Sequence, residues 1–490
     1  MFPNLTEFLK LSKRGNVIPL YQELLADMET PVSAFLKVSQ GESHAFLLES
    51  VEGEEKIARY SFVGVAPRWI WKSRGRQFEK LEGKRQITGQ IQDPLEGIGK
   101  ILSTYRYVSV SGLPRFSGGL VGYLGYDLVR FCERIPDKNP DPFQLPEAYL
   151  MLADQLLIFD HAQHKIQIVV NVFLDGVTPK LAYQQAVQRI ERLKKLLLSA
   201  KIPLTRKKPS QKTKQGWKSN FSKKEFEKIV LRAKEYICRG DIIQTVLSQR
   251  FETKISVDPF QIYRALRALN PSPYMFYLRL GEVTLVGSSP EILVRCEDGK
   301  VEVRPIAGTR PRGKEEEQDK VLAEELLNDP KERAEHIMLV DLGRNDIGRV
   351  CAKGTVTVGE LMVIERYSHV MHIVSDVTGR LAEGKNAIDV IRATFPAGTV
   401  TGAPKIKAME IIDELENVRR GPYAGAVGYF SFSGNLDSCI TIRTVVIQGN
   451  RAFIQAGAGI VADSDPAKEY QETLNKAKGM MKAVEMADGL

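Results

Sequence analysis

The chain has 490 residues, a net charge of +9 and five cysteines; 43% of its residues are hydrophobic and 26% are charged. This composition is typical of globular proteins with two or more domains. No apolar run reaches the about 18–20 residues that span a bilayer, the first ten residues lack the features of a signal peptide, and no Cys-x-x-Cys pair suggests a zinc site or a disulfide framework. We therefore expect a cytoplasmic protein without a membrane partner.

Residues 1–200 are expected to form a first domain built mainly from strands. Short apolar runs predict strands at 45–50, 61–65, 69–72, 116–126 and 166–173. The run 116–126 contains four glycines, which favour bulges or a close backbone approach. An apolar stripe with helical spacing predicts one helix over 181–198.

The positive charge is concentrated just after this domain. Between residues 192 and 224 there are twelve Lys or Arg residues and no acid, and removing these charges from +9 leaves −3 for the rest of the chain. The only aromatic residues of the segment, Trp217 and Phe221, lie near its end, so it lacks the interleaved aromatic residues of a single-strand-binding surface. We interpret 201–220 as a solvated basic linker and expect no nucleic-acid partner. The alternative is a basic tether that contacts acidic polymers.

Residues 221–490 alternate helices and strands and are expected to form a second domain. Helices are predicted at 223–239, 259–269, 314–328, 331–342, 387–393, 404–415 and 466–485. Strands are predicted at 244–251, 274–280, 283–286, 292–296, 301–305, 424–431, 438–448 and 451–456. Adjacent strand pairs with helices between them indicate an α+β fold rather than a regular βαβ array.

Two segments of this part, 329–336 and 465–472, begin alike. Each opens with Asp-Pro, a good N-cap followed by a good first helical residue, and each then carries two Glu three residues apart, on one helix face. Facing helices of this kind would present four carboxylates to one cavity, which suits Mg²⁺. The alternative is that these acids only complement the helix dipole. The four residues are Glu332, Glu335, Glu469 and Glu472.

Other features of the second part suggest an anion site. Gly457-Ala458-Gly459 follows an apolar strand, and residues 398–404 lead into a helix, where free N–H groups can bind carboxylate or phosphate. Tight turns are the alternative explanation for both. Arg443 lies in the predicted strand 438–448, where it needs either an anionic ligand or a buried carboxylate as its partner.

Several stretches of the second part closely resemble the chorismate-utilising enzymes: 305–313, 335–342, 398–405, 420–423 and 457–459, with Glu469 and Glu472. The match covers the whole second part in order. In addition, Leu47-Leu48-Glu49-Ser50 and Pro273-Tyr274-Met275 resemble the tryptophan-sensing elements of the anthranilate synthase large component. The resemblance implies an α+β fold with two-layer β-sandwich-like antiparallel sheets flanked by helices, chorismate as substrate and Mg²⁺ as cofactor.

Two positions bear on the branch of this family. Aminodeoxychorismate synthases commonly have a Lys where this chain has Ala307, and isochorismate and salicylate synthases have a Lys at the position of Gln244. Without either Lys, the attacking group must come from outside the chain, and ammonia fits. The resemblance thus implies conversion of chorismate and ammonia to anthranilate and pyruvate, the first step of tryptophan biosynthesis. The alternatives are an aminodeoxychorismate synthase component, an isochorismate or salicylate synthase, or a tryptophan-binding regulator without turnover.

The resemblance also assigns roles to residues. Mg²⁺ is bound by Glu335 and Glu472, with Glu332 and Glu469 nearby. Glu291 is the general acid for the departing hydroxyl, and Thr309 orients the Glu291 carboxyl. Glu332 is also assigned to the catalytic residues. His372 removes the C2 proton. His372 sits in an apolar strand, so a structural role is the alternative, and His369 is expected to be structural. The substrate-binding set is Gly308, Thr309, Thr399, Tyr423, Arg443, Gly457, Ala458 and Gly459.

Partners follow from what the chain lacks. None of the five cysteines lies in the Gly-x-Cys-x-Gly turn of a class I glutaminase, so a separate glutamine amidotransferase subunit is implied, in a hetero-oligomer such as a heterotetramer. L-tryptophan is expected as a feedback inhibitor. The resemblance places its site at Ser50, Pro273, Tyr274 and Met275.

Overall fold

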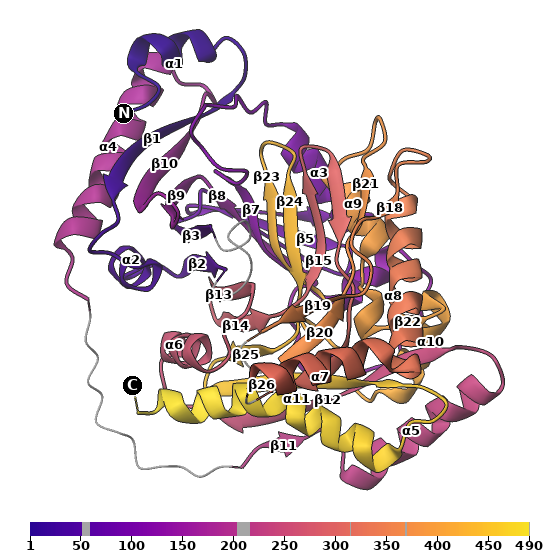
Figure 1. Ribbon diagram of the computed structural model, residues 1–490. Helices are drawn as coiled ribbons and strands as arrows, with labels where there is room; N and C mark the ends of the chain where they lie inside the picture. The colour runs from indigo at the N-terminus through magenta and orange to yellow at the C-terminus, as the bar shows by residue number, and fades with distance from the viewer. Residues whose placement is uncertain (51–58, 203–215, 314, 368–369, 490) are drawn as a thin grey trace.

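Two large antiparallel sheets pack face to face and carry helices on their outer sides (Figure 1). The computed structural model describes residues 1–50, 59–202, 216–313, 315–367 and 370–489. The α+β expectation, with two packed antiparallel sheets flanked by helices, is confirmed. No described helix combines the length and the apolar character needed to cross a membrane.

The first sheet draws on both halves of the chain. Its strands, in spatial order, are β1 (Val17–Leu25), β10 (Lys165–Phe173), β9 (Gln155–Asp160), β3 (Tyr60–Val65), β2 (His44–Glu49), β13 (Tyr274–Leu280), β14 (Val283–Ser289), β25 (Thr444–Gln448), β26 (Arg451–Ile460), β12 (Gln244–Lys254) and β11 (Lys218–Ser219), and β22 (Gly402–Ala403) also pairs with β12.

The second sheet also contains strands from both halves of the chain. Its order is β18 (Thr357–Val358), β21 (Val377–Arg380), β16 (Lys300–Val303), β15 (Ile292–Glu297), β24 (Leu436–Ile440), β23 (Ala426–Ser431), β7 (Gly119–Leu124), β8 (Ala148–Ala153), β4 (Ile70–Arg74), β5 (Gln77–Glu82) and β6 (Arg85–Gln90). A small third sheet contains β17 (Ile306–Pro311), β20 (Val370–Val374) and β19 (Val363–Arg366).

The helices cover the outer faces of the two sheets. The first sheet is covered by α1 (Leu5–Leu11), α2 (Pro31–Val38), α4 (Pro179–Ser199), α6 (Pro259–Leu269) and α11 (Pro466–Ala487), and α5 (Lys223–Cys238) packs beside them. Near the second sheet lie α3 (Pro94–Ser103), η1 (Tyr126–Phe131), α8 (Pro330–Gly348) and α9 (Ala387–Thr394). η2 (Gly398–Val400) and α10 (Lys405–Leu415) pack against β12 and β22 at the end of the first sheet. α7 (Glu316–Asn328) packs against the small third sheet.

Strand alternation explains how one sheet serves two cores. In β13, Phe276 and Leu278 pack into the core between the sheets, whereas Met275 and Tyr277 pack into the core under the helices. Successive side chains of a strand point to opposite faces, so a strand buried on both faces is apolar throughout. This is why β13 is apolar from Tyr274 to Leu278.

Strands from both sides of the basic segment pair directly with each other. β2 pairs with β13 and β7 pairs with β23, so the sheets join residues before and after it. Residues 203–215, the centre of that segment, lie outside the described residues. The division into domains 1–200 and 221–490 around a linker 201–220 stays a prediction.

The single strand predicted over 438–448 is wrong. The extended backbone is interrupted at Arg443, whose φ is +50°. The strand before this interruption, β24, belongs to the second sheet, and the strand after it, β25, belongs to the first. Thr441 and Ile442 complete the crossing between the sheets. Apolar residues continue across the break, which is why the sequence pattern conceals it.

The predicted end of the last strand at residue 456 is also wrong. β26 continues to Ile460, and Gly457, Ala458 and Gly459 pair with Ser248, Leu247 and Val246 of β12. These glycines therefore lie within a paired strand rather than in a loop after it.

The two Asp-Pro helix starts are confirmed. The Asp329 carboxylate accepts hydrogen bonds from the backbone N–H groups of Lys331 and Glu332 at the start of α8. The Asp465 carboxylate accepts one from the N–H of Lys468 at the start of α11. Both caps satisfy backbone donors that have no partner within the helix.

Candidate functional site

A cavity of about 660 Å³ lies where α8, α11 and the small third sheet meet the end of β26. It brings together nearly all of the residues that the sequence singled out for catalysis, substrate binding and metal binding. Those that line it are Glu291, Gly308, Thr309, Glu332, Glu335, His372, Thr399, Tyr423, Arg443, Gly457, Gly459, Glu469 and Glu472.

Ala458 is the predicted site residue that the structure places elsewhere. Its side chain is fully buried in a cluster with Leu247 and Phe226, on the opposite face of β26 from the cavity. Gly457 and Gly459, one position to each side, face the cavity. Ala458 lies in a strand, where successive side chains point to opposite faces, so its side chain points away from the cavity. In the loop expected from the sequence, this constraint would not apply.

A side chain at either cavity-facing glycine would require a neighbouring group to shift. A Cβ on Gly457 would lie 2.8 Å from the Tyr423 hydroxyl, and one on Gly459 would lie 2.6 Å from Nε2 of Gln244. Because these two positions have no side chain, the polar groups of Tyr423 and Gln244 can approach the backbone of this wall of the cavity.

The four glutamates reach the cavity from α8 and α11. Glu335 accepts a hydrogen bond from Nε2 of Gln244 at 3.0 Å, and Glu472 forms an ion pair with Lys476 at 2.6 Å. Burial, together with the neighbouring Glu335, raises the pKa of Glu332. Burial, together with the neighbouring Glu472, raises the pKa of Glu469. The two carboxylates of each helix are thus close enough to repel each other.

These groups fit a lightly held magnesium ion better than a closed metal cage. Among the described residues, no three carboxylate, imidazole or thiolate groups converge to hold a metal. Mg²⁺ usually binds through one or two carboxylates and completes its shell with water and substrate oxygens. Glu335 and Glu472 can supply those two oxygens, and a cation between the helices would relieve the repulsion within each glutamate pair.

Glu291 is positioned as a protonated acid. It lies between β14 and β15, lines the cavity and is only 8% exposed. Burial raises its pKa to about 8, although the hydroxyl of Thr399 and the charge of Lys476 act in the opposite direction. Because the neutral form of a buried carboxyl is favoured, Glu291 can donate a proton near neutral pH.

His372 is positioned as a neutral base. Its Nδ1 lies 2.8 Å from the carbonyl oxygen of Gly308 and 3.1 Å from the hydroxyl of Thr309. Because a carbonyl only accepts, Nδ1 carries the hydrogen and Nε2 has the free lone pair. Burial lowers the His372 pKa, despite the bond to Gly308. His369, expected to be structural, lies outside the described residues.

Arg443 enters the cavity from the break between β24 and β25. One of its guanidinium nitrogens donates to the carbonyl oxygen of Lys476 at 3.1 Å, and no ion pair joins it to a carboxylate within the described ranges. Burial lowers its pKa. A buried guanidinium that has only a carbonyl partner favours an anionic ligand in the adjoining space.

Tyr423 completes this wall of the cavity. Burial raises its pKa to about 12, so its hydroxyl is neutral and can donate a hydrogen bond. Lys476 also lines the cavity, and the sequence reasoning missed it. Its spacing of four residues from Glu472 was the available signal, because such pairs meet on one helix face. Lys476 also donates to the carbonyl oxygen of Gly457.

A second, smaller cavity of about 60 Å³ brings together the residues expected to sense tryptophan. Ser50, Pro273, Tyr274 and Met275 line it, because β2 and β13 are neighbouring strands. The hydroxyl of Ser50 is buried and has no hydrogen-bond partner in the described part of the chain. The Tyr274 hydroxyl donates to Asp437 at 2.9 Å.

Comparisons with known proteins show the family of this chain. Residues 43–482 match the family model described as chorismate binding enzyme. The chain belongs to this family. It is 53% identical to anthranilate synthase component 1 of Aquifex aeolicus over 99% of this chain and 98% of the relative. It is 50% identical to the protein of that name from Acetivibrio thermocellus, over 99% of each. The resemblance read from the sequence is confirmed.

Solved structures of the family share the fold. Anthranilate synthase component I from Streptococcus pneumoniae TIGR4 superposes with a TM-score of 0.75 at 36% identity, over 93% of this chain and 98% of that one. The menaquinone-specific isochorismate synthase from Escherichia coli gives a TM-score of 0.70 at 21% identity, over 98% of each chain. The second likeness concerns the fold alone.

Proposed function

We propose that the chain is the chorismate-converting component of an anthranilate synthase. It converts chorismate and ammonia to anthranilate, pyruvate and water, the first step of tryptophan biosynthesis. One observation carries the choice of reaction: Gln244 and Ala307 line the same cavity as Glu291 and His372, so the site has an acid and a base but no lysine at either position. The names of the relatives support the same branch.

Chorismate is a dicarboxylate, and the cavity offers separate groups for its two anionic ends. Arg443 and the hydroxyl of Tyr423 bind the enolpyruvyl carboxylate, beside the bare backbone at Gly457 and Gly459. The charge of Arg443 is free for this contact because, among the described residues, its side chain bonds only to a carbonyl oxygen. Gly308, Thr309 and Thr399 line the remaining wall.

The ring carboxylate lies toward the glutamates of α8 and α11. Glu335 and Glu472 would hold Mg²⁺, with Glu332 and Glu469 close by, and the bound ion supplies charge neutralisation and polarisation of that carboxylate. The N-terminal ends of the two helices are tied by an ion pair between Lys331 and Asp463 at 3.0 Å.

In the first chemical step, ammonia adds at C2 while the C4 hydroxyl leaves. Glu291 donates its proton to the departing oxygen, so the hydroxyl leaves as water. Thr399 lies against the Glu291 carboxyl and Thr309 is hydrogen-bonded to His372. In the second step, Nε2 of His372 takes the C2 proton as pyruvate leaves and the ring becomes aromatic.

Ammonia is supplied by a separate glutamine amidotransferase subunit. Cys296, Cys351 and Cys439 are buried, and burial raises the pKa of Cys351 to about 11, as it does for the half-buried Cys132. Such thiols are poor nucleophiles, because the thiolate is the reactive form. We also propose that L-tryptophan binds at Ser50 and Tyr274 and inhibits the enzyme.

Product analysis tests the function directly. The purified chain is given chorismate, Mg²⁺ and ammonium chloride at alkaline pH, and anthranilate fluorescence and pyruvate are recorded. Both products should appear together, and glutamine should not replace ammonium. An aminated product without pyruvate would assign the chain to the aminodeoxychorismate branch, and isochorismate or salicylate formed without ammonium would assign it to the branch that uses water.

A further inference from the structure

A small chamber lies directly behind one wall of the catalytic cavity. Its volume is about 10 Å³, which is room for a single water-sized molecule. Tyr423 and Gln455 line both spaces, so one layer of side chains separates them. The chamber is therefore adjacent to the space in which chorismate reacts but outside it.

The chamber contains a hydroxyl that has no partner. Thr441 is 0% exposed, and its Oγ1 makes no hydrogen bond within the part of the chain that the structure describes. The other threonine of the chamber, Thr444, donates to the carbonyl oxygen of Ile442 at 2.8 Å. Because an unpaired buried hydroxyl is unfavourable, the position of Thr441 favours a polar occupant.

The positive charge of the chamber wall determines which kind of polar molecule the chamber can hold. Arg250 is 6% exposed, its Nε donates to Gln455 at 3.1 Å, and it forms no ion pair with a described carboxylate. Burial lowers its pKa only to about 10, so the guanidinium stays charged at neutral pH. Arg420, the second cation of the wall, is paired with Glu416. A positive wall repels ammonium but accommodates a neutral molecule that has a lone pair.

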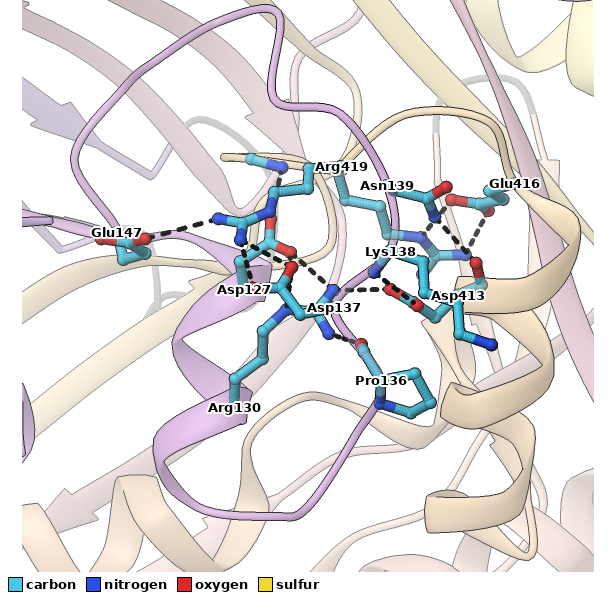
Figure 2. Close-up of polar contacts among 12 residues, drawn as sticks. Asp127, Arg130, Pro136, Asp137, Lys138, Asn139, Glu147, Asp413, Glu416 and Arg419 are labelled. Atoms are coloured by element: carbon cyan, nitrogen blue, oxygen red, sulfur yellow. Dashed lines mark hydrogen bonds and ion pairs between the residues drawn. The ribbon is translucent and has the colours of Figure 1, made fainter. Parts of the chain in front are cut away.

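Phe143 is a further residue of the chamber wall. It is buried, and the Arg250 guanidinium lies 3.9 Å from its ring centroid. Figure 2 shows how the chain on both sides of Phe143 is attached: Arg419 pairs with Asp137 and Glu147, and Asn139 donates to the carbonyl oxygen of Asp413. Polar contacts between loops far apart in the sequence thus hold Phe143 in its place in the chamber wall.

We propose that this chamber holds one molecule of neutral ammonia beside the catalytic cavity, hydrogen-bonded to the Thr441 hydroxyl, before it passes the wall of Tyr423 and Gln455 to reach chorismate. The inference rests on the proposed function, because it assumes that ammonia is the nucleophile. Water has the same size and hydrogen-bonding groups, so the experiment must separate the two occupants.

The first test compares two threonines of the same chamber. Thr441→Val removes the unpaired hydroxyl, and Thr444→Val removes one that is already bonded within the protein. With ammonium chloride as the nitrogen source, Thr441→Val should raise the KM for ammonia about 2- to 12-fold, the range expected for one hydrogen bond. Its KM for chorismate and its kcat should stay unchanged. Thr444→Val should leave all three constants unchanged.

The second test fills the chamber. Val446→Ile adds one methylene to its wall, next to the space for one small molecule. It should raise the KM for ammonia without changing the KM for chorismate. Thermal unfolding of each variant separates misfolding from loss of the ammonia site. If a folded Thr441→Val or Val446→Ile variant keeps the wild-type KM for ammonia, the chamber holds water only and the inference is wrong. Failure of the wild-type chain to aminate chorismate would instead reject the proposed function.

Discussion

At the scale of single residues, burial acts on an acid and a base in opposite directions. It raises the pKa of Glu291 and lowers that of His372, because it disfavours the charged form of each. One cavity therefore holds a protonated carboxyl and a neutral imidazole at the same pH. This is the combination that proton donation to a leaving group, followed by proton removal from carbon, requires.

We predict that Glu291→Gln lowers kcat by about 10²- to 10⁴-fold, the range of a lost general acid. In the wild type, the limb of the pH profile that reports Glu291 should fall as pH rises through about 8, where the required proton is lost. The profile is measured at a constant concentration of neutral ammonia, so that the titration of ammonium does not contribute. A variant that keeps the wild-type alkaline limb would contradict the assignment.

The same group should affect stability. The folded pKa of Glu291 is raised from 4.5 to about 8, so the native state binds more protons than the unfolded state between these values. Stability from this group is therefore present below pH 4.5 and is lost as pH rises toward 8. Thermal unfolding of Glu291→Gln should show a smaller decrease across this window than the wild type.

We predict that His372→Ala separates the two chemical steps. Without the base, ammonia still adds, but pyruvate leaves slowly and an aminated, non-aromatic intermediate accumulates; chromatography of quenched reactions detects it. A control is His336→Gln, because His336 is buried against Ser375 and does not line the cavity. If His372→Ala remains folded but loses both steps together, its role is not confined to the second.

At the scale of elements, capped helices could be predicted and irregular strands could not. The Asp-Pro caps of α8 and α11 are local, since the side chain bonds to its own first turn, and the sequence places them correctly. The left-handed turn at Arg443 has no local signal, because neither glycine nor asparagine occupies it. Pairing with β12 extends β26 through its glycines, and that long-range contact also turns Ala458 away from the cavity.

The helix pair α8 and α11 carries the prediction about metal. Glu335→Gln and Glu472→Gln should each weaken Mg²⁺ binding, because each removes one charged oxygen ligand. Glu485→Gln on the exposed side of α11 is the matched control and should bind Mg²⁺ normally. Calorimetry in the presence of chorismate measures the affinity, and EDTA should abolish activity until Mg²⁺ is restored. Full turnover by a metal-free preparation would reject the assignment.

At the scale of the whole molecule, the two cavities are joined through adjoining strand ends. Tyr274, in the smaller cavity, pairs with Ser289 at the end of β14, and Glu291 follows two residues later. The Ser289 hydroxyl donates to the carbonyl oxygen of Ile440, next to Cys439 of the smaller cavity. The sequence supplied the residues of both cavities, but only the pairing of β2, β13 and β14 shows how closely they adjoin.

This arrangement leads to a prediction about regulation. L-tryptophan in the smaller cavity would contact the unpaired Ser50 hydroxyl and the start of β13, and a shift there reaches Glu291 through the β13–β14 pair. L-tryptophan should therefore inhibit. Ser50→Ala removes that contact and should relieve inhibition while leaving uninhibited turnover unchanged, because Ser50 does not line the catalytic cavity.

Coupling between the two cavities must be reciprocal if it is allosteric, so chorismate should weaken tryptophan binding by the same factor by which tryptophan weakens chorismate binding. Calorimetric titration of tryptophan, with and without chorismate, measures that factor for the wild type. Ser50→Phe, which fills the cavity, should abolish tryptophan binding in both titrations and keep the Mg²⁺ response intact. Equal tryptophan affinities for the wild type in the two titrations would show that the cavities are independent, and Ser50 would then contribute to stability alone.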